Sequence, residues 1–277
     1  MMRRRLAVVS VVAAVAAAAS VALAEQAGPV SQKADVTTLQ VTNLLYRAQP
    51  GERPDLSGKF LAYLDLSDLN FKGATLAKSD LYGTDFTGAN LSGANLTGTR
   101  LDRSVLIRAN LAGADLSDAT ILRPTIYSDQ TSNPADAPKF QGATLRRIQV
   151  QADLSGADFR GADLTAAKFS PLEWRPGQGT LATAYRNVLK GCDFSGARLT
   201  RADLSKSVAW FARFTGADLT SANFNGADLS RADFSGADLT NADFTEADLD
   251  GANFVGAKGL DTVRGLDSAV NFDRSMR

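Results

Sequence analysis

The chain has no histidine and only one cysteine among its 277 residues. Without histidine it has no Ser-His-Asp triad, no imidazole metal ligand and no side chain that normally titrates near neutral pH. A single cysteine forms neither an internal disulfide nor a cysteine-based metal site. These absences exclude the commonest catalytic and zinc-binding chemistries.

Charge and glycine pattern give no ligand-binding signal either. From Glu25 onward the chain carries 30 acidic and 27 basic residues, a net charge of −3, which is not the basic excess of a nucleic-acid-binding protein. No glycine-rich loop follows a strand and opens a helix, as phosphate-cradling motifs require. We therefore predict no enzymatic activity, no catalytic residue, no cofactor, no metal and no nucleic-acid partner.

What the chain has instead is a five-residue repeat from about residue 54 to residue 257. The stretch 217–229 shows the unit: Ala, Asp or Asn, Leu or Phe, Ser or Thr, then often Gly. Helical residues five apart are rotated by roughly 140°, and strand residues five apart lie on opposite faces. Neither element buries every Leu and Phe, so the chain must turn at each repeat.

A coil of four repeats satisfies this pattern. Four turns close a coil of about 20 residues, and coils stacked about 4.8 Å apart pair backbone with backbone. The Leu or Phe and the Ala two positions earlier then point to the axis, while the polar positions face solvent. Glycine supplies the backbone angles that tight corners need. Fixed-period repeats of this kind are typical of solenoids.

The repeated unit resembles the pentapeptide-repeat family over about three quarters of the chain. The resemblance implies an all-β fold, a right-handed quadrilateral parallel β-helix. The four-sided section and the handedness come from this resemblance. In some members of the family the carboxy-terminal end also forms a dimer, so we keep capping alone and capping with homodimerisation as alternatives for that end.

The first 24 residues are typical of a secretory signal. A basic start, Arg3 to Arg5, precedes the apolar run from Leu6 to Val21 and a small-residue cleavage site ending at Ala24. The alternative is an uncleaved membrane anchor. The weakly apolar, alanine-rich run favours cleavage, so we predict an exported protein, periplasmic or secreted, with no membrane span in the mature chain.

Breaks in the repeat divide the remaining chain. We predict a lead and an N-terminal capping helix over 25–53, the β-helix over 54–257, loop insertions near 127–142 and 170–187, and a C-terminal cap over 258–277. The tail loses the repeat, and its apolar residues are predicted to cover the open end: Leu260, Val263, Leu266, Val270 and Phe272.

Three details of packing follow from the sequence. The capping helix is predicted over Asp35–Arg47, with Asp35 as N-cap and an apolar face of Leu39, Leu44 and Leu45. Repeats resume at Leu145 after the first break, and the register slips by one residue by Leu154. Phenylalanines that recur once per coil should stack in two columns: Phe194, Phe214, Phe234 and Phe254 in one, Phe224 and Phe244 in the other.

Aspartate is the one residue type abundant enough for chemistry. Asp218 and Asp238 should lie one coil apart, as should Asp228 and Asp248, at a backbone separation of about 4.8 Å. That spacing is near the roughly 5 Å between retaining-glycosidase carboxylates, so a glycan- or calcium-binding envelope protein, even an enzyme, is one alternative. The regular convex surface favours solvated aspartates instead.

Residues 214–257 hold eight acidic residues and one arginine. This excess resembles the quinolone-resistance pentapeptide proteins, which imitate DNA and occupy topoisomerases, and gives a second alternative. The export signal opposes it, as do the neighbouring basic side chains of Arg198, Arg201, Lys206 and Arg213.

Aromatic residues in and beside the second insertion are the candidate partner-binding site, because loops on rigid scaffolds often carry binding residues. They are Trp174, Arg175, Tyr185, Trp210 and Phe211. The bland alternative is that the loop covers the aromatics of the coil. Cys192 takes an inward alanine position, and we predict that it is buried rather than reactive. The function predicted is a non-enzymatic scaffold that binds an unknown partner, most simply a protein.

Overall fold

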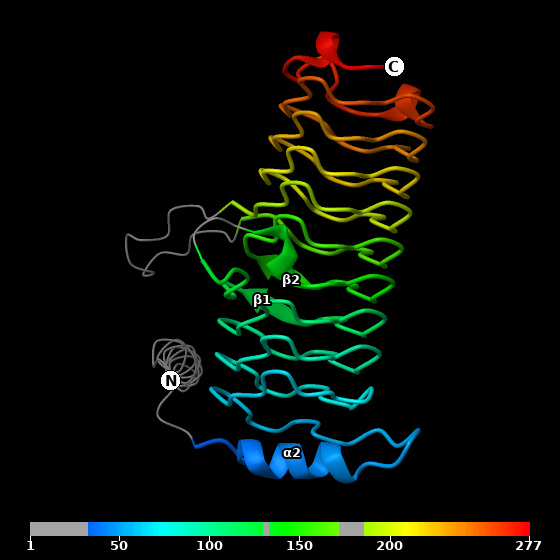
Figure 1. Ribbon diagram of the computed structural model, residues 1–277. Helices are drawn as coiled ribbons and strands as arrows, with labels where there is room; N and C mark the ends of the chain where they lie inside the picture. The colour runs from blue at the N-terminus through cyan, green and yellow to red at the C-terminus, as the bar shows by residue number, and fades with distance from the viewer. Residues whose placement is uncertain (1–32, 130–132, 172–185) are drawn as a thin grey trace, which may run out of the picture. The chain divides into compact units, whose positions relative to one another are not determined.

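The computed structural model describes residues 33–129, 133–171 and 186–277. The chain divides into two units, Met1–Lys33 and Ala34–Arg277, and the second holds the repeats. In that unit the chain winds into stacked coils that follow one another from helix α2 (Thr38–Arg47) to the C-terminus (Figure 1). The fold is a β-helix solenoid. No helix in the described ranges is long and apolar enough to cross a membrane.

Parallel β-bridges join each coil to the next. In the regular coils each bridging residue pairs with its equivalent in the next coil, and the predicted pairs of Asp218 with Asp238 and Asp228 with Asp248 are confirmed. Corner N–H groups also reach the next coil, as where Gly216 donates to the carbonyl of Ser235 at 2.9 Å. The backbone of neighbouring coils is therefore paired both along the sides and at the corners.

Few residues form longer regular elements. Strands β1 (Thr120–Leu122) and β2 (Gln149–Gln151) pair in parallel, with Ile121 opposite Val150. The short 3₁₀ helices in the described part of the chain are Pro134–Asp136, Leu260–Thr262 and Phe272–Arg274.

Aspartates that precede inward residues have a backbone role. Asp238 Oδ1 accepts hydrogen bonds from the backbone N–H of Thr240 at 3.0 Å and from its hydroxyl at 2.6 Å. Asp218 accepts the N–H of Thr220 at 3.1 Å in the same way. These bonds hold the corner that follows, which is why a short side chain with an acceptor oxygen recurs there.

The interior is a column of interlocked rings. In the first predicted column the centroids of successive rings are 5.0 Å apart, and Phe224 and Phe244 stack at the same distance in the second. The columns also meet edge to face, with Phe224 5.6 Å from Phe214 and 5.8 Å from Phe234. Both predicted stacks are confirmed, and the edge-to-face contacts fix them against each other.

The prediction that Asp35 is the N-cap of α2 is wrong, because the N-cap is Thr37. The Thr37 hydroxyl accepts the N–H of Gln40, and the Gln40 side chain accepts the N–H of Thr37. This reciprocal capping box satisfies two backbone donors. Asp35 instead accepts the N–H of Phe60 at 2.7 Å, so it ties the entering chain to the first coil.

The predicted apolar face of α2 was also wrong for two of three residues. Leu39 is 68% exposed and Leu44 is 40% exposed. Val41 and Leu45, four residues apart and thus on one face, are the buried pair. Leu39 and Leu44 are five residues apart, about 140° around the helix, so they do not share the face that packs on the first coil.

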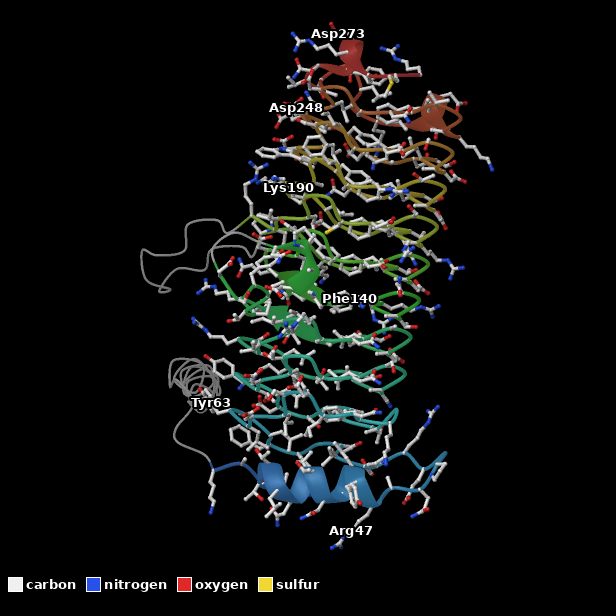
Figure 2. All side chains as sticks on the ribbon, viewed as in Figure 1. Arg47, Tyr63, Phe140, Lys190, Asp248 and Asp273 are labelled. Atoms are coloured by element: carbon white, nitrogen blue, oxygen red, sulfur yellow. The ribbon has the colours of Figure 1, made fainter. Side chains whose placement is uncertain are left out.

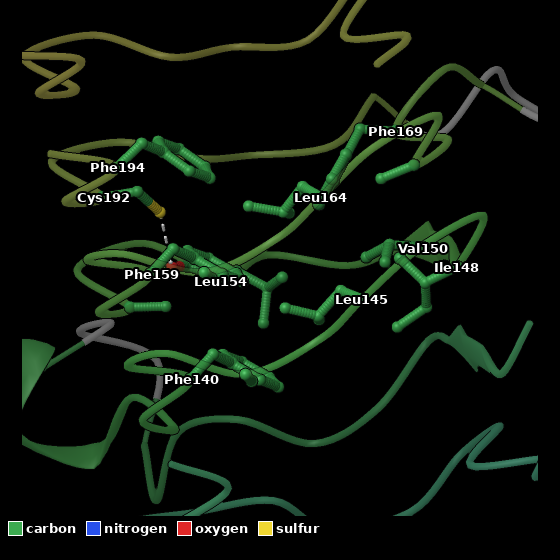
Figure 3. Close-up of a cluster of buried hydrophobic side chains, with 14 of the residues drawn as sticks. Phe140, Leu145, Ile148, Val150, Leu154, Phe159, Leu164, Phe169, Cys192 and Phe194 are labelled. Carbon is green, nitrogen blue, oxygen red and sulfur yellow. Dashed lines mark hydrogen bonds between the residues drawn. The ribbon is translucent and has the colours of Figure 1, made fainter. Parts of the chain in front are cut away.

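The first insertion is shorter than predicted. Lys139 pairs with Asn110 in the preceding coil, so the repeat resumes at Phe140 rather than at Leu145. Figure 3 shows Phe140 in the core beneath Phe159, to which it stacks at 4.8 Å. This repeat was missed because Pro138 and Lys139 replace the usual Ala and the usual Asp or Asn before the inward ring.

The predicted slip in register is confirmed, because Lys139 pairs with Asp158, whereas an unbroken register would place Phe159 opposite it.

Where the second insertion rejoins the coil, the side chain of the buried Asn187 makes hydrogen bonds to the backbone of neighbouring coils. Its amide nitrogen donates to the carbonyls of Val150 at 3.0 Å and Phe169 at 2.6 Å. Its oxygen accepts the N–H of Ala152 at 2.7 Å.

The five-residue repeat ends at the tail, but the tail continues the solenoid with a six-residue repeat. Residues spaced by six pair with the preceding coil: Lys258, Arg264, Val270 and Met276. A left-handed residue follows each of the first three: Gly259 at φ 71°, Gly265 at φ 78° and Asn271 at φ 59°. The extra residue on each side is therefore accommodated in a left-handed turn.

The apolar residues of the tail divide by this repeat. Leu260, Val263, Leu266 and Phe272 are partly buried against the core, and the Phe272 ring lies 5.8 Å from that of Phe254. Val270 is 51% exposed, contrary to the prediction, because it takes the bridging position and its side chain faces outward.

Candidate functional site

Two of the five predicted partner-binding residues fall within the described structure. Trp174, Arg175 and Tyr185 lie outside the described residues. Trp210 and Phe211 occupy one corner of the solenoid, which we call the aromatic corner, and are 39% and 48% exposed. Neighbouring large apolar side chains so accessible are unusual on a coil otherwise lined by polar residues.

Cationic residues flank the aromatic corner. One coil further along, the Arg231 guanidinium carbon lies 5.6 Å from the Phe211 ring centroid. One coil earlier, Gly191 donates its N–H to the Trp210 carbonyl at 2.8 Å. Lys190, the residue before Gly191, lies at the outer edge of that coil (Figure 2). Phe211 itself has a left-handed backbone, φ 58°, which costs a non-glycine residue about 1–2 kcal/mol.

A second aromatic site was not predicted. Tyr63 is 60% exposed, has φ 62°, and meets the Tyr82 ring at 5.5 Å with the planes 71° apart. The guanidinium of Arg100 lies 4.8 Å from the Tyr82 centroid, while Arg100 also pairs with Asp80 at 2.8 Å. The available signal was a tyrosine at a corner position that usually holds glycine or a small polar residue.

A small pocket opens where β1 and β2 end. Its volume is about 170 Å³, and it is lined by Arg123, Pro124, Ile126, Tyr127, Ala152 and Asp153. The coil below takes five residues from Ile121 to Ile126, whereas the coil above reaches Leu154 only four residues after Val150. The upper coil therefore has one residue fewer at this corner. Among the described residues, no β-bridge joins Thr125 of the lower coil to Asp153 of the upper one.

Cys192 is fully buried, as predicted, and its thiol donates to the carbonyl of Leu154 at 3.0 Å (Figure 3). Burial raises the pKa of this thiol far above its usual value, which suppresses the reactive thiolate. Within the part of the chain that the structure describes, no three acidic or cysteine side chains come together in a group that could hold a metal ion.

Comparison with known protein families gives one clear match. Pentapeptide repeats, in eight copies, match residues 61–93, 85–121, 150–170, 188–220 and 222–258, more than half of the chain. The chain belongs to the pentapeptide-repeat family. A pentapeptide-repeat protein is a right-handed β-helix solenoid and generally a non-enzymatic scaffold. No curated protein matches the chain.

Several solved pentapeptide-repeat structures are similar to the chain. HetL, involved in heterocyst differentiation regulation in the cyanobacterium Nostoc sp. strain PCC 7120, is 27% identical over 82% of this chain and 90% of its own, with a TM-score of 0.38. Full-length QnrB1, a plasmid-mediated fluoroquinolone resistance protein, is 22% identical over 71% and 92%, with a TM-score of 0.31. Rfr23 from the cyanobacterium Cyanothece 51142 is 21% identical over 64% and 90%, with a TM-score of 0.23.

The aspartates of this pentapeptide-repeat protein hold turns rather than form an acid-base pair. Burial alone would raise the pKa of Asp243, but hydrogen bonds from Thr245 leave it below the usual value. Hydrogen bonds from Thr240 lower the pKa of Asp238. A general acid needs a raised pKa, so these repeat aspartates do not fit that role. Asp102 differs, because burial raises its pKa.

Proposed function

We propose that this pentapeptide-repeat protein is an exported scaffold without enzymatic activity that binds a protein partner through the aromatic corner. The observation that carries the proposal is the exposure of Trp210 and Phe211, side by side on a rigid coil. Tryptophan and arginine are the residue types most enriched among binding hot spots, and Arg231 stands beside the pair. A rigid corner also binds at a low entropic cost, since it is ordered before the partner arrives.

The proposal includes the finer architecture. We infer a four-sided coil, because the bridges recur at five-residue steps and return to the same side at every fourth step. We assign α2 as the N-terminal cap, on the burial of Val41 and Leu45, and residues 258–277 as the C-terminal cap, on the packing of Leu260 and Phe272. Caps of this kind keep an open solenoid end from associating with others.

Export is the second part of the proposal, and the apolar run after Arg3 to Arg5 supports it. We expect cleavage after Ala24 and a mature chain that begins at Glu25. Fractionation of expressing cells followed by N-terminal sequencing tests this. A chain that keeps Met1 and stays in the cytoplasm would refute export and would leave the binding proposal to be tested there.

Two matched variants test the binding site. Phe211→Gly removes the ring and suits the left-handed backbone, and Tyr63→Gly does the same at another corner. We expect crosslinking from envelope extract to capture a defined protein with the wild type and Tyr63→Gly but not with Phe211→Gly, and the purified partner to bind in the same order. Equal capture by all three would refute the aromatic corner as the site.

The alternatives remain distinct in their tests. A glycan- or calcium-binding envelope protein would show calcium or glycan titration by calorimetry. A DNA mimic would inhibit purified gyrase. In this chain, however, acidic side chains such as Asp238 and Asp243 accept hydrogen bonds within turns. A homodimer through the C-terminal end, where Val270 and Met276 are 51% and 54% exposed, would appear in sedimentation velocity.

A further inference from the structure

Four corner residues, each one coil after the last, form one line along the solenoid, which we call the Tyr63 column: Tyr63, Gly83, Arg103 and Arg123. The hydrogen bonds show the alignment. Tyr63 donates its N–H to the carbonyl of Tyr82, and Gly83 donates to that of Asp102. Arg103 donates in turn to Leu122, at 2.9 Å. With about 4.8 Å per coil, the column spans roughly 14 Å.

The Tyr63 ring lies directly over Gly83. A Cβ added to Gly83 would stand 2.8 Å from Cδ1 of Tyr63, so the absence of a side chain at Gly83 lets the ring settle there. Figure 2 shows Tyr63 at the outer edge of the coils next to α2. The ring thus has protein on one side and, at 60% exposure, solvent on the other.

Polar groups around the ring are fixed by one another. Asp80 accepts the N–H of Tyr82 at 3.0 Å and the Nε of Arg100 at 3.0 Å. Arg100 in turn covers the Tyr82 ring, and Tyr82 supports Tyr63 edge to face. The platform is therefore held in place before any ligand binds.

At the other end of the column, Arg123 borders the pocket of about 170 Å³. Asp153 also lines the pocket, and its Oδ1 accepts the N–H of Ser155 at 3.0 Å. The Tyr127 hydroxyl donates to the Ser155 carbonyl at 2.7 Å. The lining thus combines the buried, apolar Ile126 with an arginine, a carboxylate and a phenol.

We propose that the Tyr63 column and the pocket at Arg123 together bind a polysaccharide chain that runs along the solenoid axis. One sugar ring stacks on Tyr63, and another enters the pocket, where Arg123 and Asp153 hydrogen-bond its hydroxyls. Sugars present apolar ring faces and dense hydroxyls, which match an exposed aromatic ring followed by planar charged groups. The pocket is smaller than the usual drug-sized site, as suits a single ring.

A protein partner fits this line less well. Among the large apolar residues that the described chain exposes, Tyr63 alone lies on the column, whereas the core of a protein interface is mainly apolar. The backbone of the lower coils is already paired between neighbours, so an extended peptide finds no free strand edge on this side. The inference concerns a corner other than the aromatic corner and does not rest on the proposed protein partner.

Calorimetric titration of the full-length protein with hexasaccharides tests the inference. The probes are a neutral β-1,4-glucan, an N-acetylglucosamine hexamer and a galacturonate hexamer. We expect at least one to bind, with Kd at least tenfold higher for Tyr63→Gly and for Arg123→Gln. Phe211→Gly, the same change of ring to glycine in a left-handed position, should stay within twofold of the wild type.

The outcomes separate clearly. If Arg103→Gln raises the Kd for galacturonate alone, the ligand is a uronate-containing chain. If the Kd of Arg103→Gln equals that of the wild type for every probe, the ligand is a neutral glycan. No binding of any probe by the wild type would overturn the inference. So would a Kd for Tyr63→Gly equal to that for Phe211→Gly. Melting curves of all variants check that the solenoid remains folded, and glycine at either position is expected to preserve it.

Discussion

Phe214 and Phe234 stack with ring centroids 5.0 Å apart and planes only 3° from parallel. Each ring is fully buried and is also met edge to face by Phe224. A void in this column has few ways to collapse, because the backbone on every side is paired to the next coil. The stability of the solenoid therefore depends strongly on single rings.

Phe234→Ala should lower the free energy of unfolding by about 3–5 kcal/mol, as for other buried aromatic residues. Asp238→Ala should cost about 1 kcal/mol, since it removes the turn hydrogen bonds from Thr240. Asp238→Asn keeps the acceptor oxygen and should be nearly neutral. Urea denaturation checks the series, and equal costs for Phe234→Ala and Asp238→Ala would contradict the inward and outward assignment.

Asn187→Ala should cost at least about 3 kcal/mol. It leaves the carbonyls of Val150 and Phe169 and the N–H of Ala152 buried without their partner, at about 1–3 kcal/mol each. Asn223→Ala is the control, because Asn223 sits in a regular, half-buried turn and should cost about 1 kcal/mol. Similar melting temperatures for the two variants would show that Asn187 does not close the second insertion.

Gly265→Ala tests the six-residue repeat of the C-terminal coil. A Cβ at Gly265 would lie 2.4 Å from the Cα of Thr245, whereas one at Gly236 meets nothing within 4 Å. Both have a left-handed backbone, so both substitutions carry the strain of about 1–2 kcal/mol. Gly265→Ala should cost roughly 1–3 kcal/mol more because of the clash. Chemical denaturation of the two variants measures the difference. Equal losses in the free energy of unfolding would argue against close packing of Gly265 on Thr245.

Acid should destabilise the protein mainly below about pH 4. Hydrogen bonds from Thr240 lower the pKa of Asp238, and Arg147 lowers that of Asp118. A carboxylate whose folded pKa is below the unfolded value of about 3.9 stabilises the fold above that pH. The contribution disappears as the pH falls through the folded pKa. Urea midpoints should be nearly constant from pH 7 to about 5 and fall from about pH 4 to 2.

Asp102 should behave in the opposite way. Burial raises its pKa, so ionised Asp102 opposes folding at neutral pH, and this cost disappears as the pH falls below its folded pKa and then its unfolded pKa. Asp102→Asn keeps an oxygen for the N–H of Leu122, which Asp102 accepts at 3.0 Å. We expect the variant to be more stable than the wild type at pH 7 and the difference to shrink towards pH 3. A difference that grows in acid would reverse the assignment.

The amino-acid sequence by itself determined the solenoid and the inward rings. A period of five requires a turn at each repeat if every Leu and Phe is to be buried, and it placed Cys192 at an inward position. A coil of four repeats then stacks Phe214 on Phe234. It also singled out Trp210 and Phe211, since aromatics at outward positions break the polar pattern.

Only the tertiary structure decided what the interruptions do. Counting by fives cannot show how an insertion rejoins the coil, so Phe140, Asn187 and the pocket beside Arg123 were not predicted. The start of α2 depended on a capping box that competes with Asp35, and the six-residue tail depended on left-handed residues such as Gly265. Periodicity fixes which side chains point inward within a coil. Which outward side chains meet between coils depends on the register that the backbone pairing sets.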